Sequence, residues 1–200
     1  SGSKAACEII SESYMHSFFK NTNINVATVR SGNCIGGGDW TKDRILKDCA
    51  VLCLKNKNLI IRSPNSTRPW QHVLEPIFGY LKLAQKLYFD KNKSYSTSWN
   101  FGPSRKKNMK VIEIAKFTKK FLKSKSKIII KSYHLHESKF LALDSSKSMR
   151  RLKWKTHLSD KDAIQMTLKW FKNYYDFKKK KDLLRLSSQK NNNIKKLHNT

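Results

Sequence analysis

The chain has 200 residues and a formal net charge of +28, and this length suffices for one domain with a sizeable core or for part of a larger protein. Apolar residues make up 38% of it and aromatic residues 11%, a composition that excludes a wholly disordered protein. The sequence has no apolar run of about 18 residues and does not start like a signal peptide, so we predict no membrane-spanning helix and no membrane partner.

The cysteine pattern bears on the redox environment. The chain has four cysteines, and none of them forms a Cys-x-x-Cys pair: Cys7, Cys34, Cys49 and Cys53. Cys49 and Cys53 are spaced as neighbours on one face of a helix. We therefore predict idle thiols in a cytoplasmic protein, with neither a disulfide framework nor a metal site.

The positive charge comes mainly from lysine. Only eight of the 42 basic residues are arginines, which leaves 34 lysines spread along the whole chain. Surfaces that bind nucleic acids usually favour arginine, because its guanidinium makes bidentate contacts. We therefore interpret the charge as a solvated lysine-rich surface and do not expect a nucleic-acid partner.

Predicted helices and strands alternate along the chain. Helical spacing of apolar residues predicts helices over residues 4–19, 45–54, 72–89, 111–122, 145–152 and 159–175, the last with Ser159 as its N-cap. Short β-branched or aromatic runs predict strands over residues 26–30, 59–61, 99–101 and 128–130, with a glycine-rich loop over 31–39. This alternation is typical of an α/β fold. The lysine-rich residues from Lys178 onward predict a disordered tail.

Four strings of residues occur in a characteristic order. They are Ser1-Gly2-Ser3-Lys4 with Glu8, then Gly36-Gly37-Gly38-Asp39-Trp40, then Arg68-Pro69-Trp70-Gln71-His72-Val73, and then Trp99-Asn100-Phe101-Gly102-Pro103. Together they resemble the CDP-glucose 4,6-dehydratases, which are sugar-nucleotide enzymes of the extended short-chain dehydrogenase/reductase superfamily. The second and third strings discriminate best, and the resemblance runs from Ser1 to about Tyr175.

The resemblance implies the carboxyl-terminal part of a Rossmann-type doubly wound sheet with a small α/β substrate-binding lobe. The corresponding boundaries are residues 1–58 for the incomplete Rossmann part, 59–176 for the lobe and 177–200 for the tail. The family uses NAD, but no strand–Gly-x-x-Gly-x-x-Gly–helix unit occurs in this sequence. We therefore expect that the NAD-binding half is absent, that the isolated chain is inactive, and that the full-length enzyme is a homo-oligomer.

The same resemblance assigns a catalytic role to Lys4. Enzymes of the family oxidise C4 of the sugar with NAD, eliminate water across C5–C6 and return the hydride to C6. Their catalytic tyrosine would stand immediately before Ser1. A phenol has a pKa of about 10 and needs a nearby cation to ionise at neutral pH; in the family this cation is the lysine that also holds the nicotinamide ribose. The alternative is that Lys4 is an ordinary exposed lysine.

Two residues are the main candidates for binding the substrate diphosphate. Arg68 offers a fixed fork of donors to an anionic diphosphate, in a chain that otherwise uses lysine. Asn33 follows a predicted strand, at the edge of the sheet where open α/β folds bind ligands. The alternatives are a surface ion pair for Arg68 and a turn for Asn33.

The motifs also indicate further, weaker candidates for binding the substrate. Arg44 and Arg62 are candidates for phosphate and cytidine contacts, and the resemblance places His136 and Glu137 at the pyrophosphate and sugar pocket. We interpret the glycines at 36–38 as a loop that must approach the ligand closely. For His72, Trp70 and Trp99 we expect structural roles.

Two other functions stay open from the sequence. One is a non-catalytic basic protein that binds nucleic acid or other acidic polymers through its surface and tail. The other is a related epimerase, or a dehydratase acting on another nucleotide.

Overall fold

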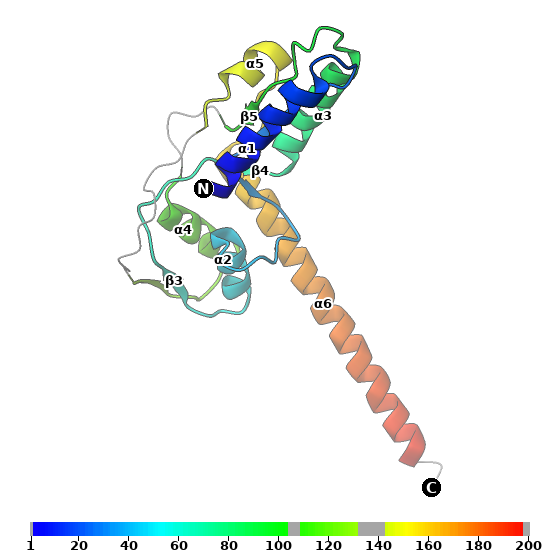
Figure 1. The fold of residues 1–200 in the computed structure, drawn as a ribbon. Helices are drawn as coiled ribbons and strands as arrows, with labels where there is room; N and C mark the ends of the chain where they lie inside the picture. Colours follow the sequence, from blue (N-terminus) through cyan, green and yellow to red (C-terminus); the bar gives the residue numbers. More distant parts are fainter. Residues whose placement is uncertain (1, 104–108, 132–142, 198–200) are drawn as a thin grey trace. The chain divides into compact units, whose positions relative to one another are not determined.

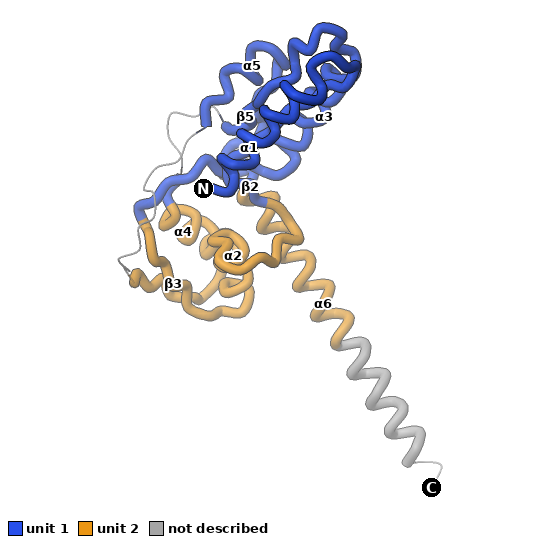
Figure 2. The backbone as a smooth tube through the Cα atoms, viewed as in Figure 1, with its two compact units in different colours: residues 1–35, 65–110, 135–163 blue, residues 36–64, 111–134, 164–200 orange. Residues whose placement is uncertain are grey.

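The structure, a computed structural model, describes residues 2–103, 109–131 and 143–197, with side chains as far as residue 182. The chain forms two compact units, each assembled from three separate segments (Figure 2). Unit 1 contains residues 1–35, 65–110 and 135–163, and unit 2 contains residues 36–64, 111–134 and 164–200. The domain boundaries expected from the sequence divide the chain on a different basis and stay a prediction.

Unit 1 consists of two pairs of parallel strands with helices packed against them (Figure 1). Its elements are α1 (Gly2–Tyr14), the π-helix η1 (Met15–Phe19), β1 (Val29–Ser31), β2 (Asn33–Ile35), β4 (Trp70–His72), α3 (Leu74–Phe89), β5 (Trp99–Phe101) and α5 (Ser146–Leu152). Strand β1 pairs with β5, and β2 pairs with β4. Both pairs join strands that are distant in sequence, as parallel pairing requires.

The core of unit 1 is aromatic. Trp99, Phe101 and Trp154 are fully buried, and the rings of Phe101 and Trp154 meet edge to face with centroids 5.1 Å apart. A Cβ at Gly79 of α3 would overlap the Phe101 ring, so only glycine lets the helix lie this close to the core. Trp70 is also buried, which confirms that Trp70 and Trp99 are core residues.

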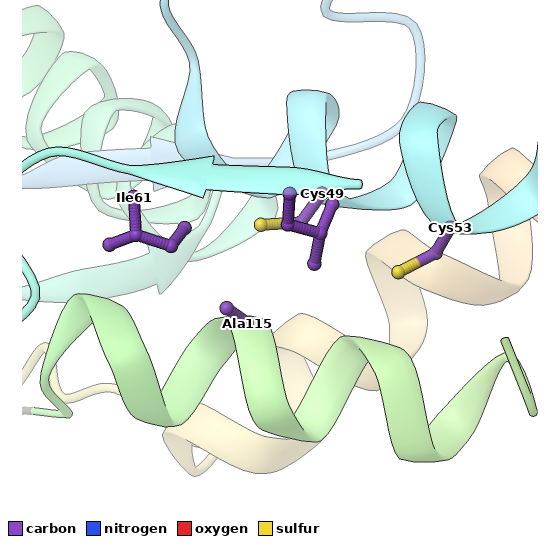
Figure 3. Close-up of a cluster of buried hydrophobic side chains, with 5 residues drawn as sticks. Cys49, Cys53, Ile61 and Ala115 are labelled. Carbon is purple, nitrogen blue, oxygen red and sulfur yellow. The ribbon is translucent and has the colours of Figure 1, made fainter. Parts of the chain in front are cut away.

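Unit 2 packs two helices against one parallel strand pair. Its elements are α2 (Ile45–Leu54), β3 (Leu59–Ile61), α4 (Val111–Phe121), β6 (Ile128–Ile130) and the part of α6 (Asp160–Leu197) from residue 164 onward. Strand β3 pairs with β6. The core brings together side chains of α2, β3 and α4 (Figure 3): Cys49, Cys53, Leu59, Ile61 and Ala115.

The two core cysteines behave as small apolar side chains. Burial raises the pKa of Cys49 to about 12 and also raises the pKa of Cys53, so both stay protonated at neutral pH. All four cysteines are free, and Cys7 is exposed. The exposure of Cys7 shows that the thiols are not all buried.

Several boundaries differ from the predicted ones. Strand β1 begins at Val29 rather than at residue 26, and β2 lies within the segment predicted as a loop. Strand β4 precedes α3, which begins at Leu74 rather than at His72. Strands β2 and β4 are stabilised by pairing with each other. Neither short sequence has a local pattern that is typical of a strand.

The largest correction concerns the carboxyl-terminal segment. Helix α6 does not end near Tyr175 but continues to Leu197, through the lysine-rich residues predicted to be disordered. This segment contains neither glycine nor proline, and lysine, leucine and arginine are good helix formers. Ser159 caps the start of α6 as predicted, since its Oγ accepts a hydrogen bond from the N–H of Asp162 at 3.2 Å. Within the described ranges, no helix is both long and apolar enough to span a membrane.

Candidate functional site

A partly exposed ion pair attaches α1 to the first strand pair of unit 1. Glu8 accepts hydrogen bonds from Arg30 Nε at 2.8 Å and from Arg30 Nη2 at 3.0 Å, and a third from Thr28 Oγ1 at 2.7 Å. Arg30 also donates to Asn100 Oδ1 on β5 at 3.2 Å. These bonds, those from Arg30 first, hold the pKa of Glu8 below its usual value. Glu8, which the sequence showed only as part of a motif, therefore fixes helix α1 on the sheet.

This contact places Lys4 at one end of the sheet. Lys4 precedes Glu8 by one helical turn and so lies on the same side of α1. After Glu8 the chain continues along α1, and it comes back beside Glu8 at Thr28, just before β1. Helix α1 and strand β1 therefore run in opposite directions. The amino end of α1, with the exposed Lys4, thus lies toward the carboxyl end of β1, where Asn33 follows.

Asn33 and Arg68 are linked through neighbouring residues in unit 1. Asn33 opens β2 opposite Trp70, and Trp70 donates its N–H to the carbonyl of Arg68 at 2.9 Å. Their neighbours are in direct contact, because a Cβ at Gly32 would lie 2.8 Å from the carbonyl oxygen of Pro69. Asn33 and Arg68 are both half-buried. Arg68 donates from Nη1 to the carbonyl of Thr67 at 2.9 Å, which orients its guanidinium.

The other two arginine candidates lie together in unit 2. Arg62, directly after β3, donates to Asp43 Oδ1 at 2.7 Å, and Arg44 lies 3.7 Å from Asp39 Oδ2. Asp43 has a left-handed backbone with φ 59°, which aspartate tolerates better than most residues. The loop before α2 therefore holds both guanidiniums by short-range ion pairs, and more than half of each remains exposed.

Asp39 in this loop stays ionised at neutral pH. Burial alone would raise its pKa, but the side-chain and backbone hydrogen bonds from Thr41 and the positive charges of Arg44 and Lys47 bring the pKa below its usual value. The carboxylate therefore remains a partner for Arg44.

The glycines at 36–38 have a packing role that the sequence did not reveal. A Cβ at Gly37 would overlap the indole ring of Trp170 in α6, and Gly38 has a positive φ of 80°. Trp40 packs beside the same ring, against Phe171 and Tyr174 with centroids 5.3 and 5.1 Å away. Glycine is thus required at Gly37 because the backbone there lies close to Trp170 within unit 2. The predicted approach of this loop to a ligand stays a prediction.

Buried polar residues on β4 and α3 were missed as candidates. Gln71, 1% exposed, donates from Nε2 to the carbonyl of Phe101 at 2.7 Å and so ties the end of β5 to β4. Glu75 accepts hydrogen bonds from the N–H groups of His157 and Leu158 at 2.8 and 2.7 Å. A buried amide and a buried carboxylate cannot be recognised without the tertiary structure, because both residue types are usually exposed.

His72 is a structural residue in this arrangement. Its side chain is buried, and its Nδ1 accepts a 3.4 Å hydrogen bond from the N–H of Leu74 at the start of α3. Burial lowers its pKa, and the opposing charge of Glu75 does not cancel this effect. His72 is therefore neutral at neutral pH and caps the first turn of α3.

Two candidates lie outside the described residues, namely His136 and Glu137. Within the part of the chain that the structure describes, no group of three His, Cys, Asp or Glu side chains is arranged to hold a metal ion.

The described residues do not by themselves fit the pyrophosphate of NAD. A dinucleotide-binding turn needs glycines that lead directly into a helix, so that the N–H groups of the helix face the phosphates. The segment Gly36–Gly38 does not do so, because α2 begins only at Ile45. Lys4 is the residue that the family resemblance assigns to the cofactor.

Comparison with known proteins shows a clear relative by sequence. The chain is 38% identical over 179 residues to CDP-glucose 4,6-dehydratase of Salmonella typhimurium, a match that covers 86% of this chain and 49% of that enzyme. The chain matches no protein-family model. It therefore spans about half the length of the curated relative.

Solved structures show the fold. UDP-glucose 4-epimerase of Thermotoga maritima, determined with UDP-glucose, superposes with a TM-score of 0.68 at 18% identity, over 82% of this chain and 51% of that one. UDP-glucuronic acid 4-epimerase of Bacillus cereus, determined with UDP-glucuronic acid and NAD, has a TM-score of 0.67 at 19% identity, over 82% and 50%. The α/β fold expected from the sequence is thus confirmed. By sequence the chain is thus similar to a CDP-glucose 4,6-dehydratase, and by fold it is similar to two UDP-sugar 4-epimerases, about half of whose length it spans.

Proposed function

We propose that this chain supplies the sugar-nucleotide-binding half of a CDP-glucose 4,6-dehydratase. The observation that carries the proposal is the 38% identity to the Salmonella typhimurium enzyme over 86% of this chain. The enzyme would convert CDP-glucose to CDP-4-keto-6-deoxyglucose. It would need NAD, whose binding site would lie in the other half of the fold.

Unit 1 would contribute the catalytic cation and two substrate contacts. Lys4 would lie beside the tyrosine that acts on the C4 hydroxyl and would favour its ionised form. Arg68 would bind the diphosphate with its guanidinium fork, and the Asn33 carboxamide would hydrogen-bond the same group. The pairing of Asn33 with Trp70 and the close approach of Gly32 to Pro69 support the two substrate contacts.

Unit 2 would contribute a second basic contact. Arg44 and Arg62 keep more than half of their surface exposed while their ion pairs with Asp39 and Asp43 limit their mobility. Such guanidiniums suit phosphate and cytidine contacts, because little side-chain entropy is lost when the ligand binds. His136 and Glu137 would contact the pyrophosphate and the sugar, in line with the family resemblance.

The reaction type is tested in a fusion protein. The half of the Salmonella typhimurium enzyme outside the match is joined to the amino end of this chain, and the product from CDP-glucose is identified by mass spectrometry and NMR. We expect the 4-keto-6-deoxy sugar, loss of activity in Lys4→Met, and retained activity in the matched control Lys20→Met. A folded fusion that only epimerises C4, or that leaves CDP-glucose unchanged, would contradict the proposal.

A further inference from the structure

An aromatic cluster lies at the surface of unit 2. Trp170 and Tyr174 of α6 stack with ring centroids 5.4 Å apart and an interplanar angle of 9°. Trp40 packs beside both rings, with centroids 6.2 and 5.1 Å away. All three side chains are nevertheless between 39% and 46% exposed. Grouped aromatic side chains in contact with water are typical of an interaction surface rather than of single exposed residues.

The aromatic face continues along α6 beyond the core of unit 2. Phe171 is the last buried residue among the described side chains of this helix, and no side chain from 172 to 182 is buried. Phe177 follows Tyr174 by three residues and Trp170 by seven, so it lies on the same face of the helix. Its side chain is 69% exposed. The aromatic face therefore extends into a part of the helix that does not pack on the core of its own unit.

Lysines border this aromatic face. Lys178 and Lys181 follow Tyr174 by four and seven residues, which places them on the same side of α6. Between residues 164 and 182 the helix has six lysines and only two aspartates, and one of these, Asp176, is paired with Lys172 at 2.9 Å. The four consecutive lysines at 178–181 repel one another, so a negatively charged surface would stabilise this segment.

This combination of side chains matches the surface of an anionic membrane. Tryptophan and tyrosine rings favour the level of the lipid headgroups, because each has an apolar body and a polar atom. Lysine keeps its ammonium at the headgroups while its methylenes lie along apolar surface, and each lysine near an anionic membrane strengthens binding. A helix of this kind lies in the plane of the interface and needs no spanning length. The expectation of no membrane partner rested on the lack of a spanning segment and does not address such a helix.

A nucleic acid matches the same surface less well. Proteins bind single strands by stacking the bases on open faces of aromatic rings. Trp170 and Tyr174 instead stack on each other, and a Cβ at Gly37 would overlap the indole of Trp170. The protein itself therefore covers part of these ring faces. The basic residues beside them are lysines, whereas contacts to bases favour arginine.

We propose that unit 2 binds the surface of an anionic lipid membrane through an aromatic–basic surface that consists of Trp40, Trp170, Tyr174, Phe177, Lys178 and Lys181. The aromatic rings enter the headgroup region, and the two ammonium groups contact lipid phosphates. The inference goes beyond the proposed reaction and does not depend on it, because none of these six residues is a candidate for binding substrate or cofactor.

Vesicle flotation tests the binding and its dependence on charge. The chain is mixed with vesicles of phosphatidylcholine alone, or of phosphatidylcholine and phosphatidylglycerol in equal parts. We expect binding to the anionic vesicles only, and weaker binding as the salt concentration rises. The double variant Lys178→Glu/Lys181→Glu should bind the anionic vesicles less tightly by about tenfold or more. No flotation with the anionic vesicles, or equal flotation with both kinds, would overturn the proposal.

A second double variant controls for net charge. Lys116→Glu/Lys120→Glu reverses two exposed lysines of α4 in the same unit, and it should float as the original chain does. Equal loss in both double variants would show an effect of net charge alone and would overturn the proposal. The fusion protein is measured in parallel, so that the result does not depend on whether the chain folds alone.

The aromatic contribution is tested separately. Phe177→Ser should weaken flotation by about fivefold or more, because a large apolar side chain no longer leaves water on binding. Phe89→Ser is the matched control, since Phe89 of α3 is 71% exposed, and it should have no effect. Equal flotation of Phe177→Ser and the original chain would contradict a role of the aromatic face.

Tryptophan fluorescence shows whether the rings reach the lipid. Of the five tryptophans, three are buried in unit 1, namely Trp70, Trp99 and Trp154. Quenching by bromine-labelled lipid therefore reports on Trp40 and Trp170. We expect quenching in the original chain and its loss in Trp40→Phe/Trp170→Phe, which should still float. Flotation without quenching of the original chain would overturn the entry of the rings, and binding of a single-stranded RNA oligonucleotide in place of vesicles would assign the surface to nucleic acid and overturn the proposal.

Discussion

Glu8 of α1 receives two hydrogen bonds from the guanidinium of Arg30 on β1, at 2.8 and 3.0 Å. The contact joins the helix that carries Lys4 to the strand that leads to Asn33. Because α1 has no buried residue of its own, its position depends on this polar contact more than on packing.

Replacing Glu8 by glutamine should destabilise unit 1 by about 1 kcal/mol at neutral pH, the scale of a partly exposed, charge-assisted pair. The pKa of Glu8 is lowered from 4.5 in the folded state, chiefly by Arg30. The stabilisation is therefore complete above pH 4.5 and is lost as the pH falls through the lower folded value.

Urea unfolding at several pH values measures this effect. The difference between the original chain and Glu8→Gln should shrink as the pH falls below 4.5. Glu12→Gln, an exposed glutamate one turn further along α1, is the control and should have little effect. A Glu8→Gln difference that is independent of pH would contradict the ion-pair explanation.

Gly37→Ala should destabilise unit 2, because the new Cβ would overlap the Trp170 ring. A forced shift of a packed aromatic ring costs about 1–3 kcal/mol. Gly2→Ala is the control, because nothing lies within 4 Å of a Cβ there. In a Trp170→Ala background the cost of Gly37→Ala should largely disappear; full additivity in chemical unfolding would exclude this contact as the cause.

His72 should make the stability of the chain depend on pH below about 6.5. Burial lowers its folded pKa from 6.5, so the unfolded chain binds the proton first and stability falls as the pH drops through this range. Replacing His72 by glutamine should flatten the fall, whereas His16→Gln at an exposed position should leave it unchanged. An equal slope in all three proteins would contradict the buried neutral histidine.

The sequence predicts elements that have a strong local pattern. Helix α2 and strands β3, β5 and β6 have the predicted bounds, because apolar residues dominate each of them. Strands β2 and β4 were missed because each forms only against the other. The site follows the same rule: the motifs single out Lys4 and Arg68, whereas the Glu8–Arg30 pair and the Gly37–Trp170 packing join residues that are distant in sequence.

Arg68 should control substrate affinity in the fusion enzyme. Arg68→Lys keeps the charge but removes the bidentate fork, so KM for CDP-glucose should rise by the equivalent of about 1–3 kcal/mol. Arg150→Lys, an exposed arginine on α5, is the matched control. An unchanged KM in Arg68→Lys would contradict a role of Arg68 in binding the diphosphate.

The most direct measurement of the central claim is the nucleotide preference of the fusion enzyme. We would determine kcat/KM for CDP-glucose, dTDP-glucose and GDP-mannose under the same conditions. We expect CDP-glucose to be the best substrate by at least tenfold, which corresponds to about 1.4 kcal/mol of transition-state binding. Equal or faster turnover of dTDP-glucose or GDP-mannose would contradict the assignment of this chain to a CDP-glucose 4,6-dehydratase.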